Sequence, residues 1–229
     1  MKSVSTLALG VALVLGGASV VATAPAAAKK KPDAAAQPAQ RSFNLSKEER
    51  AALLPVQTAV TAKDWAAAQA ALPAAVAAAQ SPDARYAIGR FQLEIGLGTS
   101  NVAMQAQGLD NLVASGQVPA ADLPVIIRNQ GVLANNAGDK AKAEAAFARV
   151  VELSPNDPEA LISLAQVKND LKKPKEAVQL ISRAIEMKRS AGQTVDESWY
   201  KYALKLAFDG RRDPALSQAS MTLSRQLVA

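Results

Sequence analysis

A pattern of small and bulky residues recurs along the second half of this sequence, and this recurrence constrains the fold more than any other feature. The positions of Gly131, Ala143 and Phe147 are repeated 34 residues later, and again after a further 38 residues; the repeats hold Ala165, Ala177 and Ile181, then Ala203, Ala215 and Ala219. A unit of this length accommodates two short helices but cannot bury its own apolar faces. Neighbouring units must therefore stack on one another.

Helix-capping signals lie between these positions. Ser46 with Glu49 and Thr194 with Glu197 have the spacing of a capping box. A capping side chain precedes proline at Ser81-Pro82, Asp157-Pro158 and Asp213-Pro214, and glycines that suit helix ends are found at Gly116, Gly138 and Gly210. Together these signals predict about ten helices of roughly 14 to 16 residues. Pro55 and Pro73 fall inside two of them, so we expect those helices to be kinked or interrupted.

The composition favours thin helices and excludes several kinds of chemistry. Hydrophobic residues make up 49% of the chain but aromatic residues only 4%, and the sequence has no cysteine and no histidine. Disulfides, Cys/His zinc sites and Ser-His or Cys-His catalytic dyads are therefore excluded. The adjacent acids Glu48-Glu49 and Asp196-Glu197 stand at predicted helix starts, where the helix dipole favours them. We predict no enzyme activity, no cofactor and no bound metal.

The segment from Pro124 to Asp157 resembles the tetratricopeptide repeat. Its first helix places Ile127, Gln130, Gly131 and Ala134 at the family's signature positions; Ala143, Phe147 and Pro155 match the second helix and its exit. The resemblance implies an all-α fold, a right-handed α-solenoid of about five helix-turn-helix repeats. More narrowly, the run "LISRAIEMKRSAGQTVDESWYKYALKLAFDG" resembles exported tetratricopeptide-repeat proteins of sphingomonad-type alphaproteobacteria.

We expect four segments along the chain. Residues 1–28 have the charged start, apolar stretch and small-residue site of a signal peptide cut after Ala28, the alternative being an uncleaved anchor. Residues 29–45 read as a disordered linker, 46–118 as divergent repeat-like helical pairs, and 119–229 as three repeat units. The predicted location is the periplasm. The family's chains usually continue further, so we expect a truncated last unit or self-association through an uncapped end.

The first helices of such a solenoid line a concave groove that binds a protein or peptide. Positions between the packing residues give the expected groove side chains: Arg128, Asn129, Val132, Asn135, Ser163, Gln166, Asn169, Tyr200 and Lys201. Their amides and guanidinium can hydrogen-bond a peptide backbone or a carboxylate. The alternative is that they are ordinary polar residues on a solvated face.

Basic residues gather at two predicted turns, and they suggest a second kind of partner. They are Lys168, Lys172, Lys173, Lys175, Arg211 and Arg212. Such a ridge fits anionic lipid headgroups or acidic polysaccharide in the envelope, unless these are simply solvated turns. Nucleic acid is not expected because aromatic side chains do not interleave with the basic ones. A third reading is a non-catalytic accessory subunit of an envelope enzyme complex.

Overall fold

The computed structural model describes residues 42–210 and 213–228. The predicted signal peptide, most of the predicted linker and the Arg211-Arg212 pair lie outside these residues. The described part contains ten helices and no strand: α1 (Lys47–Thr61), α2 (Trp65–Ala78), α3 (Pro82–Gly98), α4 (Val102–Ala114), α5 (Leu123–Asn136), α6 (Lys140–Leu153), α7 (Pro158–Asp170), α8 (Pro174–Ser190), α9 (Glu197–Asp209) and α10 (Pro214–Val228). None of these helices is long and apolar enough to cross a membrane.

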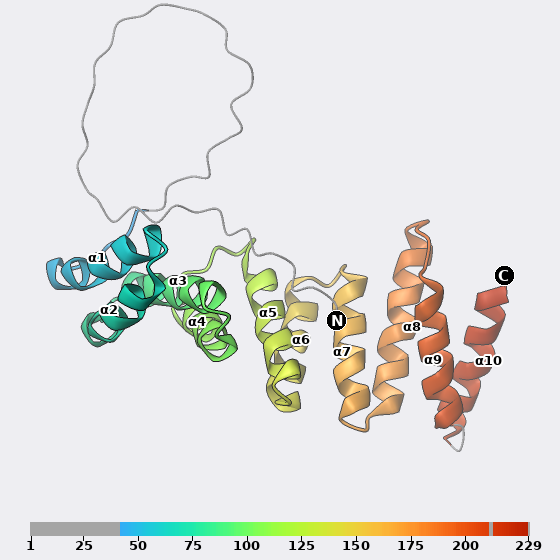
Figure 1. Cartoon of the computed structure of the whole chain (residues 1–229). Helices are drawn as coiled ribbons and strands as arrows, with labels where there is room; N and C mark the ends of the chain where they lie inside the picture. The colour runs from blue at the N-terminus through green and yellow to red at the C-terminus, as the bar shows by residue number, and fades with distance from the viewer. Residues whose placement is uncertain (1–41, 211–212, 229) are drawn as a thin grey trace, which may run out of the picture.

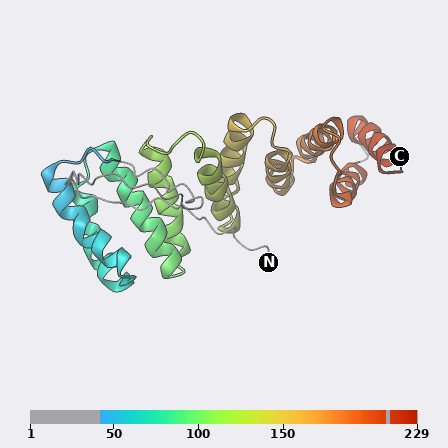
Figure 2. The ribbon, with the colours of Figure 1, turned by 90° about the horizontal axis from the view of Figure 1, so that it is seen from above.

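Consecutive helices form five pairs that follow one another from α1 at one end to α10 at the other (Figures 1 and 2). The second helix of one pair packs against the first helix of the next, as α4 does against α5 and α6 against α7. The helix axes turn along the array, since α1 lies across the view in which α7 and α8 stand upright (Figure 1). This arrangement confirms the predicted all-α solenoid of five helix-turn-helix repeats.

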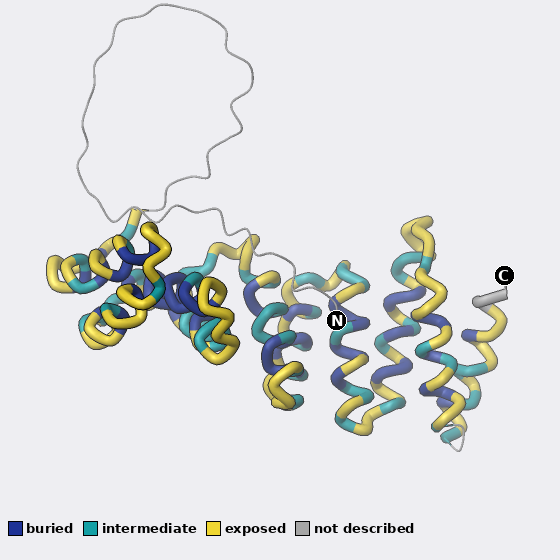
Figure 3. The backbone as a smooth tube through the Cα atoms, in the orientation of Figure 1, coloured by how far each residue is buried: buried dark blue, intermediate teal, exposed yellow. Residues whose placement is uncertain are grey.

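The core is a series of small clusters along the array (Figure 3). Each cluster lies between neighbouring helices, and the largest joins α7, α8, α9 and α10 around Ile181 and Trp199. The recurring small residues Ala143, Ala165, Ala177 and Ala203 are fully buried, as the spacing predicts for points of close helix approach. Stability therefore accumulates through contacts between neighbours, the behaviour expected of a repeat array.

The same turn joins the two helices of four successive pairs. Each contains one residue in the left-handed region, with φ of 56° at Lys63, 56° at Ser100, 84° at Gly138 and 62° at Lys172. The backbone N–H of the residue that follows it donates to the carbonyl five residues earlier in the chain, with an N···O distance of 2.8–2.9 Å. This hydrogen bond closes the end of the first helix. In the first three turns the side chain of that next residue then caps the following helix; these caps are Asp64, Asn101 and Asp139.

Gly89 and Gly108 allow the backbones of α3 and α4 to come into direct contact. A Cβ added to Gly108 would lie 2.6 Å from the Leu93 nitrogen and 2.8 Å from the Gly89 oxygen. Both contacts are to backbone, so the helices would have to separate. Gly131 faces side chains instead: its added Cβ would lie 3.1 Å from the Phe147 ring. Gly89 and Gly108 thus mark a tight helix pair in the divergent part of the array, residues 46–118.

A buried carboxylate ties α1 to the start of α3. Glu49 is only 3% exposed and completes the predicted capping box with Ser46. Its other interactions are with the next pair: it accepts from the Gln80 N–H at 2.9 Å, and from the Ser81 N–H at 2.6 Å and hydroxyl at 3.0 Å. Burial raises the pKa of Glu49, but these donors outweigh it and hold the pKa below its ordinary value.

The last residues of the predicted linker pack against the array. The Phe43 ring lies 6.0 Å from that of Tyr86, and the Asn44 N–H donates to Asp83 at 2.8 Å. Leu45 is buried in the cluster formed by α1, α2 and α3. The packed part of the chain therefore begins before the capping residue Ser46.

The structure gives two further details of the predicted helices. The N-cap of α9 is Asp196, whose carboxylate accepts from the Ser198 N–H at 2.8 Å, and not Thr194. The helices containing Pro55 and Pro73 run without interruption. Both prolines are exposed, and so are Ala51 and Gln69 four residues earlier. Water can therefore reach the carbonyls that lose their helical hydrogen bonds.

The third repeat unit also departs from the predicted register. Helix α10 begins 11 residues after Ala203, whereas α8 begins 9 residues after Ala165. The two extra residues move the packing face of α10, so Ala215 is exposed and Leu216 is buried. The predicted equivalence of Ala215 with Ala177 is therefore wrong. The absence of a side chain at Gly210 makes room for Leu216.

Candidate protein-binding surface

The predicted groove residues lie on three successive first helices, α5, α7 and α9. On α5, Arg128 forms an ion pair with Asp157, the N-cap of α7. The Asn129 amide nitrogen donates to the Val125 carbonyl at 2.9 Å in the same helix. Val132 is half-buried and packs beside the cluster around Phe147. Of these three residues, Arg128 thus makes a contact with the next repeat, and Asn129 stays partly accessible.

Asn135 belongs to a junction between repeats. Its side-chain oxygen accepts from the Lys140 ammonium at 2.7 Å, and the same ammonium pairs with Asp170 at the end of α7, also at 2.7 Å. Asn169 hydrogen-bonds Tyr202 of α9. Burial, followed by the nearby Asp170 charge, raises the pKa of Tyr202 above its ordinary value despite that hydrogen bond. Asn135 is thus linked through Lys140 to the end of α7, and Asn169 links the end of α7 to the middle of α9.

The remaining groove residues differ in exposure. Ser163 is half-buried and donates to the Glu159 carbonyl at 2.9 Å. Gln166 and Lys201 are exposed, and Lys201 pairs with Glu197 at 2.9 Å. Tyr200 is buried in the α7–α10 cluster, so packing accounts for it. We therefore define the first-helix face by its accessible members Asn129, Gln166 and Lys201.

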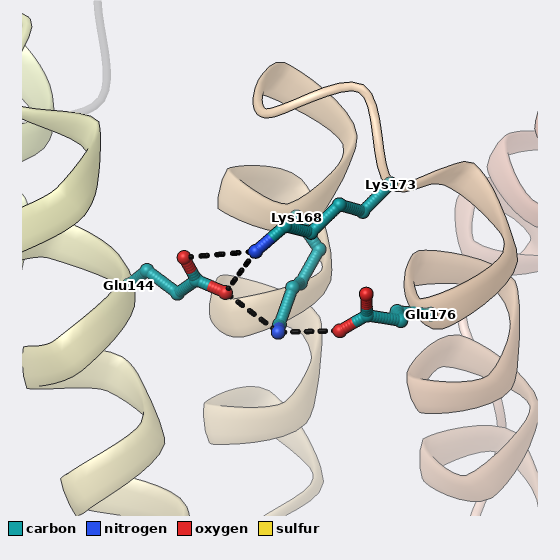
Figure 4. A network of polar contacts seen from close by, with 4 residues as sticks. All are labelled: Glu144, Lys168, Lys173 and Glu176. Carbon is teal, nitrogen blue, oxygen red and sulfur yellow. Dashed lines mark hydrogen bonds and ion pairs between the residues drawn. The ribbon is translucent and has the colours of Figure 1, made fainter.

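The lysine-rich turn forms an ion-pair network across three helices (Figure 4). The Lys168 ammonium of α7 contacts Glu144 of α6 at 2.6 Å and Glu176 of α8 at 2.5 Å. Lys173 also contacts Glu144, at 3.0 Å. The two lysines hold the pKa of Glu144 below its ordinary value, and the two carboxylates raise the pKa of Lys168. The network explains these lysines without an external anion.

The other two basic residues of the predicted ridge that the structure describes do not join this network. Lys175 lies 3.8 Å from Asp213 and Lys172 is exposed at the left-handed turn position. Arg211 and Arg212 lie outside the described residues. The structure therefore brings Lys168 and Lys173 together around one carboxylate, and Lys175 faces the turn before α10.

Sequence reasoning missed a cavity between α4, α5 and α6. Its volume is about 320 Å³, and it is lined by Val102, Ala103, Ala106, Asp110, Gln130, Leu133, Ala134, Ala137, Asp139 and Lys142. The sequence does contain a signal for this cavity. When the repeats are compared, the junction of α6, α7 and α8 has long side chains at positions where the junction of α4, α5 and α6 has alanine. We call this space the alanine cavity.

Comparisons with known proteins agree with the repeat assignment. Residues 135–193, from the end of α5 through α8, match the family described as tetratricopeptide repeat. This match confirms the predicted resemblance to the tetratricopeptide repeat. No curated protein sequence matches the chain significantly.

Several solved structures resemble the chain. One is PilW, described as a widely conserved type IV pilus biogenesis factor, at 19% identity over 79% of this chain and 77% of that one, with a TM-score of 0.45. PilF of Pseudomonas aeruginosa aligns at 15% identity over 78% and 76%, with a TM-score of 0.41. A MamA protein aligns at 16% identity over 80% and 94%, with a TM-score of 0.47.

Proposed function

We propose that this protein is an exported, non-catalytic scaffold that binds a polypeptide partner in the cell envelope through its first-helix face. The observation that carries the proposal is the stack of five helix pairs, in which residues 135–193 match the tetratricopeptide-repeat family. Such an array builds an extended binding surface from neighbour contacts alone. The amides of Asn129 and Gln166 suit a peptide backbone because each offers both a donor and an acceptor.

Export rests on the sequence of residues 1–28. If the signal peptide is removed, the mature chain begins at Lys29 and is recovered in the periplasmic fraction. N-terminal sequencing and intact-mass measurement of protein from fractionated cells test this directly. Retention of residues 1–28, or recovery of the chain in the cytosolic fraction, would contradict export.

Partner binding is tested by crosslinked co-purification from an envelope extract. The test variant carries Asn129→Ala, Gln166→Ala and Lys201→Ala; Tyr200 is left intact because it is buried. A matched control carries Arg149→Ala, Gln179→Ala and Gln218→Ala, three exposed positions on second helices. We expect the native chain and the control to retain one specific polypeptide that the test variant loses. Equal capture by all three proteins would rule out the first-helix face.

The same experiment distinguishes peptide binding from the alternative function, which is docking on anionic envelope components through the basic turns. Binding through Lys172, Lys173 and Lys175 would survive the first-helix substitutions and disappear as salt rises. The ion pairs of Lys173 and Lys175 within the array reduce the charge that such a ridge offers. A salt-sensitive capture that the test variant keeps would therefore move the function to the turns.

A further inference from the structure

The alanine cavity lies where the second helix pair meets the third, near the turns that follow α3 and α5. Small side chains from α4 and α5 form its walls, chiefly Ala103, Ala106 and Ala134. It opens to solvent, because Val102 and Ala137 at its edge are exposed. Asn129, Gln166 and Lys201, the members of the first-helix face, do not line the cavity, so the two surfaces are distinct.

The next junction, between α6, α7 and α8, shows what normally occupies this space. The N-caps Asn101 and Asp139 align α4 with α6, which makes Ala106 equivalent to Glu144. The period of 34 residues makes Ala134 equivalent to Lys168. Glu144 and Lys168 form a 2.6 Å ion pair, with side chains only 22% and 18% exposed. The cavity exists because two alanines replace the pair that fills the equivalent space.

The rim of the cavity has an excess of negative charge. Asp110 accepts from the Lys142 ammonium at 2.5 Å and from the Gln130 amide at 2.8 Å. Asp139 lies on the same rim and accepts from the Lys142 N–H at 2.9 Å. Two carboxylates thus face one ammonium, although the whole chain carries a net charge of +6. In the next junction Lys173 and Glu176 take the places of Asp139 and Lys142.

We propose that the alanine cavity is a docking pocket for one large apolar side chain of a partner polypeptide, with a neighbouring lysine or arginine of that partner paired to Asp110 or Asp139. A cavity of about 150 Å³ lined by aliphatic side chains already holds benzene, so this volume accommodates a phenylalanine or leucine side chain. Large side chains buried in such pockets supply much of the energy of protein interfaces. The proposal stands apart from the first-helix face, and its test does not depend on that face.

The probe is the peptide acetyl-Gly-Lys-Phe-Lys-Gly-amide, titrated into the ¹⁵N-labelled protein and followed by NMR. We expect saturable shifts confined to amides around the cavity, including Ala103, Leu133 and Ala137. Replacing the peptide's phenylalanine with alanine should weaken binding by about tenfold, because it removes the buried apolar area. Replacing both lysines with glutamate should also weaken it, because like charges then meet at the rim.

Filled-cavity variants complete the test. Ala137→Leu copies Leu171 at the equivalent place, and Ala103→Leu fills the cavity from α4; both positions are exposed, which favours folding. We expect each to weaken the lysine peptide at least tenfold, whereas Ala145→Leu, exposed on α6 outside the cavity, leaves binding unchanged. Unaltered binding to Ala137→Leu and Ala103→Leu would overturn the proposal. Equal affinity for free phenylalaninamide would overturn it too, because the cavity would then be a small-molecule site.

Discussion

Glu49 shows how one side chain can serve two helix pairs. Its carboxylate caps α1 and also accepts from the backbone and hydroxyl of Ser81, which caps α3. Hydrogen bonds to a buried charge contribute more than neutral ones, and leaving their donors unpaired removes further stability. The interaction therefore joins the first two pairs and also completes the cap at the start of α1.

We predict that Glu49→Gln lowers the free energy of unfolding by about 1 to 3 kcal/mol at neutral pH. The pKa of Glu49 is lower in the folded chain than its ordinary value, so the unfolded state takes up the proton first as pH falls. The stabilisation from the carboxylate is complete above the ordinary pKa and is lost as pH falls through the folded pKa. Urea unfolding of both proteins from pH 7 to pH 3 should show their difference shrinking. A difference independent of pH would contradict this role.

Among elements, helix separation is set by glycine in some pairs and by small side chains in others. We predict that Gly108→Ala lowers the free energy of unfolding by about 2 kcal/mol, since its Cβ would meet backbone atoms of α3. Gly131→Ala should change it by less than about 1 kcal/mol. There the Phe147 ring has to shift only slightly, and alanine gains helix propensity. Chemical denaturation of the two variants tests the order, and a reversed order would contradict the packing described for α3 and α4.

The sequence predicted those elements well where the signal was local. Capping residues such as Ser46 and Asp157, and the buried alanines of the central repeats, were read from spacing alone. What escaped prediction depends on contacts between helices. The second role of Glu49 needs Ser81, and the burial of Leu216 needs the two extra residues before α10. The alanine cavity depends on Ala106 and Ala134, which lie on different helices, so no local sequence signal marks it.

For the whole molecule, the sequence also predicts self-association through the last helix pair. Met221 of α10 is 55% exposed and Phe208 of α9 is 59% exposed. We expect light scattering after size-exclusion chromatography to show a mass that rises with protein concentration, and Met221→Glu to reduce that rise because it places a charge in the apolar contact. A constant monomer mass in the native chain would refute self-association, and a rise that the variant leaves unchanged would place the contact elsewhere.

In the proposed function, a partner polypeptide lies along the first helices of the stack. Site-specific photo-crosslinking in cells detects this contact directly. A photoreactive residue is placed in turn at Gln166 and Lys201 on first helices, and at Gln179 and Gln218 on second helices; all four positions are exposed. We expect one adduct of the same mass at both first-helix positions and none at the second-helix positions. Adducts only at Gln179 and Gln218, or none at Gln166 and Lys201, would contradict it.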